Sequence, residues 1–250
     1  MGAIDLYAHQ ASAGFDRKVE ASLALLARAQ REFAPLTQAS SLGAEDMVVT
    51  DLLQRGGIAS AIFVLDTGRL HPETLALVDR LRAHYRRAVE VYRPDAAEAA
   101  AFTAAHGEDA MYQSIDLRRQ CCHIRKMEPL ERALAGHNGW ITGLRREQSN
   151  ARADVADIEP GQGRAKINPL ADWTWGDVWH YIALRGVPYN PLHDQFMPSI
   201  GCAPCTRAIS IGEDFRSGRW WWEQEGAKEC GLHADHASTV PMIAIRETHA

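Results

Sequence analysis

Apolar positions along this chain follow two patterns, which predict helices and strands in turn. Residues 17–33 carry apolar side chains at helical spacing, and Pro35 ends that run. Residues 61–65 read Ala-Ile-Phe-Val-Leu, a continuous apolar run typical of a strand buried on both faces of a parallel sheet. Similar signals predict strands at 36–40, 89–92 and 140–142, and helices around 47–53, 72–86, 96–105 and 175–185.

The order of these elements predicts the fold class. Alternating strands and helices are typical of an α/β fold with a doubly wound, mostly parallel sheet. In such sheets a ligand lies beyond the carboxyl ends of the strands. The loops at 41–46, 66–69 and 143–152 each follow a predicted strand. We therefore expect a binding site where these three loops meet.

The pattern changes from about residue 154 onward. Pro, Gly and Trp become frequent there, and only the helix at 175–185 stands out. After Trp222 the sequence has little periodicity. We expect a single α/β domain over 1–222 and a mobile C-terminal tail over 223–250.

Composition narrows the class of protein. With 250 residues, 46% hydrophobic and 24% charged, the chain fits a soluble globular protein with one sizeable core. A formal net charge of −5 gives no reason to expect nucleic-acid binding. We find neither a secretory signal nor an apolar stretch of the roughly 18 to 20 residues that a membrane span needs. These features predict a cytoplasmic protein without membrane contact, and the sequence allows a homo-oligomer.

Four of the five cysteines occur in two close pairs. Cys202 and Cys205 form a C-x-x-C, a spacing that suits two thiolates on one metal centre. Cys121 and Cys122 are adjacent, and neighbouring side chains diverge by about 100° on a helix, so both rarely fit one small zinc ion. A cubane iron–sulfur cluster is larger and accepts adjacent ligands with less strain. Buried apolar cysteines and structural zinc remain the alternatives.

The fifth cysteine, Cys230, has no partner in sequence. Lys228 and His233 flank it, and nearby cations favour the reactive thiolate, although Glu229 opposes that effect. Local sequence alone does not separate a catalytic cysteine from an incidental one.

Several separate motifs together resemble one family, the assimilatory adenylyl-sulfate (APS) reductases, within the wider group of phosphoadenylyl-sulfate (PAPS) and APS reductases. They cover nearly the whole chain, from about Ser40 to His233. The motifs are the two cysteine pairs, Lys-Glu-Cys-Gly-Leu-His around Cys230, Ser-Leu-Gly-Ala-Glu-Asp at 41–46, Leu-Asp-Thr-Gly-Arg at 65–69, Gly-Leu-Arg-Arg-Glu-Gln-Ser-x-x-Arg at 143–152 and Arg-x-x-Arg-Trp-Trp-Trp-Glu at 216–223.

This resemblance implies an adenine-nucleotide hydrolase-like fold of the pyrophosphatase-loop type and a role for each motif. The four paired cysteines, Cys121, Cys122, Cys202 and Cys205, would hold a 4Fe–4S cluster, and Cys230 would be the catalytic nucleophile. The substrate would be adenosine 5′-phosphosulfate, reduced to sulfite with thioredoxin or a similar dithiol protein as partner. The expected substrate-binding residues are Ser41, Gly43, Ala44, Glu45, Asp46, Leu65, Thr67, Gly68, Lys126, Gly143, Arg145, Arg146, Arg152, Arg216 and Arg219.

The residue types agree with these roles. A Gly-containing turn between strand and helix brings backbone N–H groups to an anion, and Arg forks match phosphate and sulfate oxygens. Glu45 and Asp46 conflict with an anion, so we expect them in the first helical turn with their side chains turned away. Lys126 is expected between the cluster and the substrate.

Three rival functions stay open from sequence. The first is a PAPS reductase, or an enzyme that accepts both nucleotides. The second is an adenylyl-transferring enzyme of the same superfamily, against which Cys230 argues. The third is a non-enzymatic zinc module that binds nucleotides.

Overall fold

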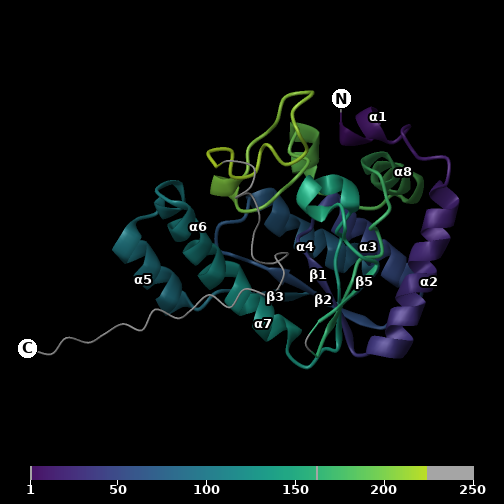
Figure 1. Cartoon of the computed structure of the whole chain (residues 1–250), viewed down its shortest axis with the longest axis horizontal. Helices are drawn as coiled ribbons and strands as arrows, with labels where there is room; N and C mark the ends of the chain where they lie inside the picture. Colours follow the sequence, from purple (N-terminus) through teal and green to yellow (C-terminus); the bar gives the residue numbers. More distant parts are fainter. Residues whose placement is uncertain (1, 162, 224–250) are drawn as a thin grey trace, which may run out of the picture.

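Six strands form one sheet at the centre of the protein (Figure 1). The structure, a computed structural model, describes residues 2–161 and 163–223. The strand order is β3 (Glu90–Tyr92), β2 (Ser60–Leu65), β1 (Leu36–Ser40), β4 (Gly139–Ile141), β6 (Ala165–Ile167) and β5 (Ile158–Pro160). All neighbours pair in parallel except β5, which is antiparallel to β6.

The α/β fold with a mostly parallel sheet is thus confirmed. Each strand predicted from sequence is present to within one or two residues. Strands β5 and β6 were not predicted, because each has only three residues and carries a charged side chain in its middle, Glu159 and Lys166.

Helices cover both faces of the sheet (Figure 1). One face carries α2 (Phe15–Phe33), α3 (Ala44–Arg55), α4 (Pro72–Tyr85) and α8 (Trp175–Arg185), and the short α1 (Ala3–Tyr7) packs on α8. The other face carries α7 (Glu128–Leu134), which contacts β2 and β3, with α5 (Ala96–His106) and α6 (Ile115–Cys122) beside it.

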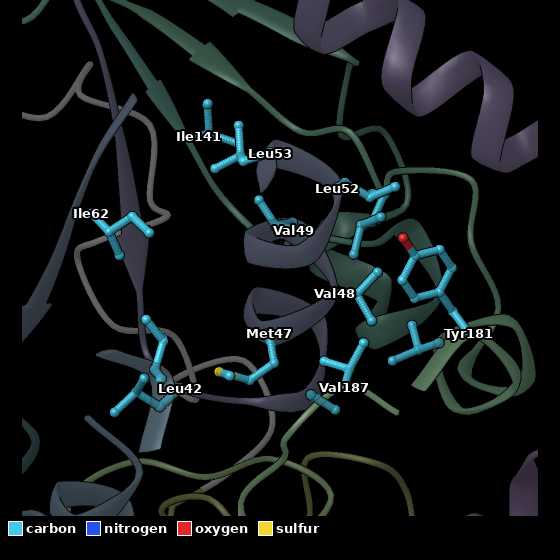
Figure 2. Packing of buried hydrophobic residues seen from close by; sticks show 14 of the residues in the cluster. Leu42, Met47, Val48, Val49, Leu52, Leu53, Ile62, Ile141, Tyr181 and Val187 are labelled. Carbon is cyan, nitrogen blue, oxygen red and sulfur yellow. The ribbon is translucent and has the colours of Figure 1, made fainter. Parts of the chain in front are cut away.

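Helix α3 is the centre of the main hydrophobic core. Its side chains Met47, Val49 and Leu53 face β2 and β4, while Val48 and Leu52 face α8 (Figure 2). Residues 44–53 of α3 are all buried, polar ones included, and only its last two residues, Gln54 and Arg55, are exposed. Because α3 cannot shift within this packing, its N-terminus is held firmly at the sheet edge.

A buried carboxylate clamps the N-terminal region to α8. Asp177 accepts hydrogen bonds from the backbone N–H of Ser12 at 2.7 Å and from Nζ of Lys18 at 2.7 Å. It also forms a capping box with Thr174 at the start of α8. Burial alone would raise the pKa of Asp177, but these hydrogen bonds outweigh it and lower the pKa to about 2.

This clamp predicts a loss of stability in acid. Because the pKa of Asp177 is lower in the folded state than in the unfolded chain, its contribution is complete above about pH 4 and disappears as the pH falls toward 2. Replacing Asp177 with Asn is expected to cost about 2 kcal/mol of unfolding free energy at neutral pH. Denaturant unfolding of both proteins across pH 2–7 measures the difference, which should shrink below pH 4. A constant difference would contradict this assignment.

The described chain ends against α6. Glu223, where the expected tail begins, forms a buried ion pair with Arg118 of α6 at 2.9 Å. Residues 224–250, with Cys230, lie outside the described residues. Within the described ranges, no helix combines the length and apolarity that crossing a membrane requires.

Candidate functional site

A cavity of about 190 Å³ opens at the carboxyl ends of β1, β2 and β4. The three loops expected to meet there, at 41–46, 66–69 and 143–152, all contribute to its lining. The segment from 196 to 223, green to yellow in Figure 1, runs across the top from the α8 side to α6 and supplies the remaining wall. Eleven expected substrate-binding residues line this cavity: Ser41, Gly43, Glu45, Asp46, Leu65, Thr67, Lys126, Gly143, Arg152, Arg216 and Arg219.

The turn between β1 and α3 has an unusual backbone. Leu42 has a φ of +62°, a left-handed conformation that costs energy for a branched side chain, and it is fully buried. Gly43 then caps α3. Gly143 of the opposite loop packs so closely that a Cβ there would lie 2.6 Å from Oδ1 of Asp46. The two loops therefore fix each other's position.

Glu45 and Asp46 occupy the first turn of α3 as predicted, but the expectation that their side chains turn away is wrong. Both carboxylates are buried and line the cavity. Oδ2 of Asp46 accepts hydrogen bonds from the backbone N–H and the hydroxyl of Ser41, at 2.7 and 2.6 Å. Burial raises the pKa of Asp46 to about 6, although these hydrogen bonds oppose the shift. Long-range packing against the 143–152 loop turns the side chains inward.

The first N–H of α3 is already bonded within the protein. Ala44 is fully buried, does not line the cavity, and donates its backbone N–H to Nε2 of His193 at 3.1 Å. Nδ1 of His193 lies 2.9 Å from the carbonyl oxygen of Met197, so the imidazole is a neutral Nδ1–H tautomer. Burial lowers the pKa of His193 to about 4. His193 thereby ties the segment that enters the cavity wall at 198–201 to the start of α3.

Two adjacent arginines with the same expected role lie in different places. Arg145 is fully buried behind the cavity, where its Nε donates to Glu45 at 3.0 Å and its guanidinium packs over the rings of Trp175 and Phe215. Arg146 points outward into ion pairs with Asp157 and Asp172. Neither lines the cavity, so direct substrate contact by these two arginines stays a prediction that the geometry does not support. Arg145 has extended backbone and Arg146 begins the 3₁₀ turn Arg146–Gln148, so the chain changes conformation between the two residues.

Gly68 also lies just outside the cavity lining. Its φ of +71° forms the turn after β2, and its N–H donates to Asp66 at 3.0 Å. Glycine adopts this conformation without strain.

Four cations face the cavity: Lys126, Arg152, Arg216 and Arg219. They outnumber the two acidic side chains of the lining, so the cavity attracts anions although the whole chain is acidic. Contacts within the protein hold Arg219 in place. Its Nε donates to the carbonyl oxygen of Cys205 at 3.1 Å, and its guanidinium stacks on Trp220.

All four paired cysteines line a second, smaller cavity next to the first. Cys121 and Cys122 end α6, and the helix continues through one π-helical segment, His123–Met127, before α7. Cys202 and Cys205 flank a short 3₁₀ turn, Ala203–Cys205. Lys126 and Trp220 line both cavities. The expected position of Lys126 between the two sites agrees with this geometry.

The lining of the small cavity combines the four thiols with the cations Arg69, Arg118, Arg125 and Lys126, a donor set that could hold an anionic group bound through sulfur. Burial raises the pKa of Cys205 to about 11, and the nearby Cys202 adds to the effect while Arg219 and Lys126 oppose it. A bound metal centre would relieve the repulsion between deprotonated thiols. Nε1 of Trp220 is buried without a hydrogen-bond acceptor among the described residues, and a cluster sulfur would supply one. Within residues 2–161 and 163–223, no three His, Cys, Asp or Glu side chains surround a point that suits a single metal ion.

Several residues that line the main cavity were not predicted from the sequence. The segment Pro198, Ser199, Ile200 and Gly201 forms one wall. Thr142, directly before the loop at 143–152, and Gln148, within it, also line the cavity. For residues 198–201, the only sequence signal is that they directly precede the C-x-x-C. Gln148 lies within the arginine loop but carries no charge, so the charge pattern did not single it out.

Comparison with known proteins places this geometry in a family. The sequence profile of the phosphoadenosine phosphosulfate reductase domain matches residues 35–208. The chain is 50% identical over 229 residues to a protein of Burkholderia cepacia named adenosine 5′-phosphosulfate reductase, covering 91% of this chain and 92% of that one. It is 51% identical over 215 residues to the protein of the same name from Allochromatium vinosum, covering 85% and 84%.

Solved structures agree with the fold. The phosphoadenylyl-sulfate reductase of Candida auris, in a phosphate complex, superposes with a TM-score of 0.63 at 30% identity, over 76% of this chain and 94% of that one. Yeast FAD synthetase superposes with a TM-score of 0.55 at 12% identity, over 82% and 73%, a likeness of fold alone. The mostly parallel sheet, the loops at its carboxyl edge and the matched profile lead to one assignment: the chain belongs to the phosphoadenosine phosphosulfate reductase domain family.

Proposed function

We propose that this protein reduces adenosine 5′-phosphosulfate to sulfite and AMP in sulfate assimilation and cysteine biosynthesis. The single observation that carries the proposal is the shared wall of the two cavities. A cationic cavity at the nucleotide-binding edge of the sheet adjoins a cavity lined by four cysteines, with Lys126 and Trp220 between them. The names of the relatives at about 50% identity support the same substrate.

The adenylate would lie along the loops at 41–46, 65–69 and 143–152, with its phosphosulfate toward the four cations. Arg152, Arg216, Arg219 and Lys126 would stabilise the charge that develops on the transferring and leaving oxygens. Arg145 would act indirectly, by holding Glu45 in place.

The reaction needs a sulfur nucleophile, and we assign it to Cys230. Its thiolate attacks the sulfate sulfur, the bond from sulfur to the AMP oxygen breaks, and AMP leaves. The enzyme then carries an S-sulfonate on Cys230. One thiol of an external dithiol, from thioredoxin or a similar protein, attacks Sγ of Cys230, which forms a mixed disulfide and releases sulfite. The second thiol of that protein then attacks the mixed disulfide, closes its own disulfide and frees the Cys230 thiolate for the next turnover. The dithiol thus supplies both electrons.

The four cysteines that line the second cavity would hold a 4Fe–4S cluster. When bound, the cluster would fix the two cysteine pairs together and place a compact negative charge beside Lys126. Thiols stay reduced in the cytoplasm, so a free Cys230 and a dithiol partner fit that compartment.

An assay of sulfite release tests this function. Anaerobically purified full-length protein with thioredoxin and a thioredoxin-reducing system is expected to release sulfite and AMP from APS in equal amounts. The second candidate function is reduction of PAPS, which the likeness to the Candida auris PAPS reductase favours. Turnover of PAPS is therefore measured in parallel. Sulfite from PAPS but not from APS would replace the proposed substrate, and sulfite from neither would exclude the activity.

A further inference from the structure

The side-chain amide of Gln148 joins two opposite charges of the main cavity. Gln148 ends the 3₁₀ turn Arg146–Gln148 and lines the cavity. Its Nε2 donates to Oε1 of Glu45 at 2.9 Å. Its Oε1 accepts from Nη1 of Arg152 at 2.6 Å. The neutral amide therefore lies between a carboxylate and a guanidinium.

Further contacts fix which way this amide faces. Its Oε1 also accepts the backbone N–H of Arg145 at 3.2 Å, and its Nε2 also approaches the carbonyl oxygen of Gly143 at 3.4 Å. A flipped amide would present its N–H₂ to Arg152 and its oxygen to Glu45. A donor would then face a donor, and an acceptor would face an acceptor. Only one orientation satisfies all four contacts.

The two charges that Gln148 separates are both enclosed. Glu45 and Arg152 are each 7% exposed, so a direct ion pair between them would be strong and little screened by water. Such a pair would direct the guanidinium of Arg152 toward protein instead of toward an anionic ligand. A carboxylate at position 148 would have the same effect on Arg152.

We propose that Gln148 is a positioning residue, which spaces Arg152 from Glu45 and so keeps the charge of Arg152 directed at the phosphate of a bound nucleotide. This inference rests on the proposed function, since it assumes an adenine nucleotide in the cavity. Gln148 should therefore affect the binding of the phosphate group of the ligand. The adenosine part would be bound by the other loops and should not depend on Gln148.

The test compares AMP with adenosine, which lacks the phosphate. Gln148→Glu keeps the size of the side chain, but the new carboxylate would form an ion pair with Arg152 and would repel the carboxylate of Glu45. In the full-length protein, calorimetry is expected to show AMP affinity reduced roughly tenfold or more, the range for a hydrogen bond to a charged group. Adenosine affinity, measured by displacement of AMP, should stay within about twofold. Gln54→Glu, the same change on the exposed side of α3, is the matched control and should alter neither.

A second variant covers the case in which Gln148→Glu does not fold. Gln148→Met is neutral and of similar length, and it lets Glu45 and Arg152 approach each other, so the same selective loss of AMP affinity is expected. Equal losses for AMP and adenosine would show a merely structural role and overturn the inference, as would unchanged AMP affinity in both variants. Sulfite release from APS by the unaltered protein is a separate measurement, so failure of the proposed function is distinguishable from failure of this one.

Discussion

Replacing Cys230 with Ser is expected to lower sulfite release by roughly 10⁴-fold or more, because a serine hydroxyl is a far poorer nucleophile than a thiolate at neutral pH. Cys230 lies outside the described residues, so this prediction rests on the sequence and on the proposed function. The visible absorption of the cluster and the affinity for AMP should stay unchanged. Mass spectrometry of the unaltered enzyme, incubated with APS but without reductant, should find the S-sulfonate on the peptide that contains Cys230.

Cys202→Ser is the matched comparison, because it makes the same change in the cavity that Cys121, Cys122 and Cys205 also line. This variant should lose the iron-dependent absorption that Cys230→Ser keeps. Near-normal sulfite release by Cys230→Ser would refute the mechanism. An S-sulfonate on any other cysteine would move the nucleophile to that residue.

Arg219→Met is expected to reduce kcat/KM for APS by roughly 100-fold, the usual effect of removing one group that stabilises charge in the transition state. Arg219 faces the cavity, is 6% exposed, and also holds the carbonyl oxygen of Cys205. Part of the loss of kcat/KM should therefore come from a less firmly positioned Cys205, and so from weaker binding of the cluster. Iron content, measured on the same preparation, separates the two effects.

Arg146→Met is the control for that experiment. The sequence assigned both arginines to the substrate, but Arg146 points away into ion pairs with Asp157 and Asp172. Exposed pairs of this kind contribute little stability, so kcat/KM should remain within about threefold. Equal losses in the two variants would mean that the cavity described above is not the substrate site.

The sequence predicted the main elements because their signals are local. The apolar run of β2 and the helical spacing of α2 depend only on neighbours in the chain, and both elements form where expected. The short strands β5 and β6 could not be recognised, because three residues do not establish a period. Strand β6 pairs with β4, from an earlier part of the chain, and β5 pairs only with β6.

The candidate site was predictable in its outline and less so in its details. Which loops meet at the sheet edge follows from the parallel arrangement of the strands, so the cavity appears where it was expected. The inward turn of Glu45 was not predictable from the preference of acidic side chains for helix N-termini. That direction results from Arg145 and Gln148, about 100 residues away, which hydrogen-bond to the carboxylate.

The sequence by itself therefore determined the fold class, the loops that build the site and the cysteine pairs, because each is encoded by local pattern or spacing. Only the tertiary structure decided which charged residues face the cavity. Adjacent side chains such as Arg145 and Arg146 carry the same charge and nearly the same local sequence. They differ because one meets Glu45 and two aromatic rings inside the protein, while the other meets Asp157 and Asp172 at its surface. Such partners come together only when the chain has folded.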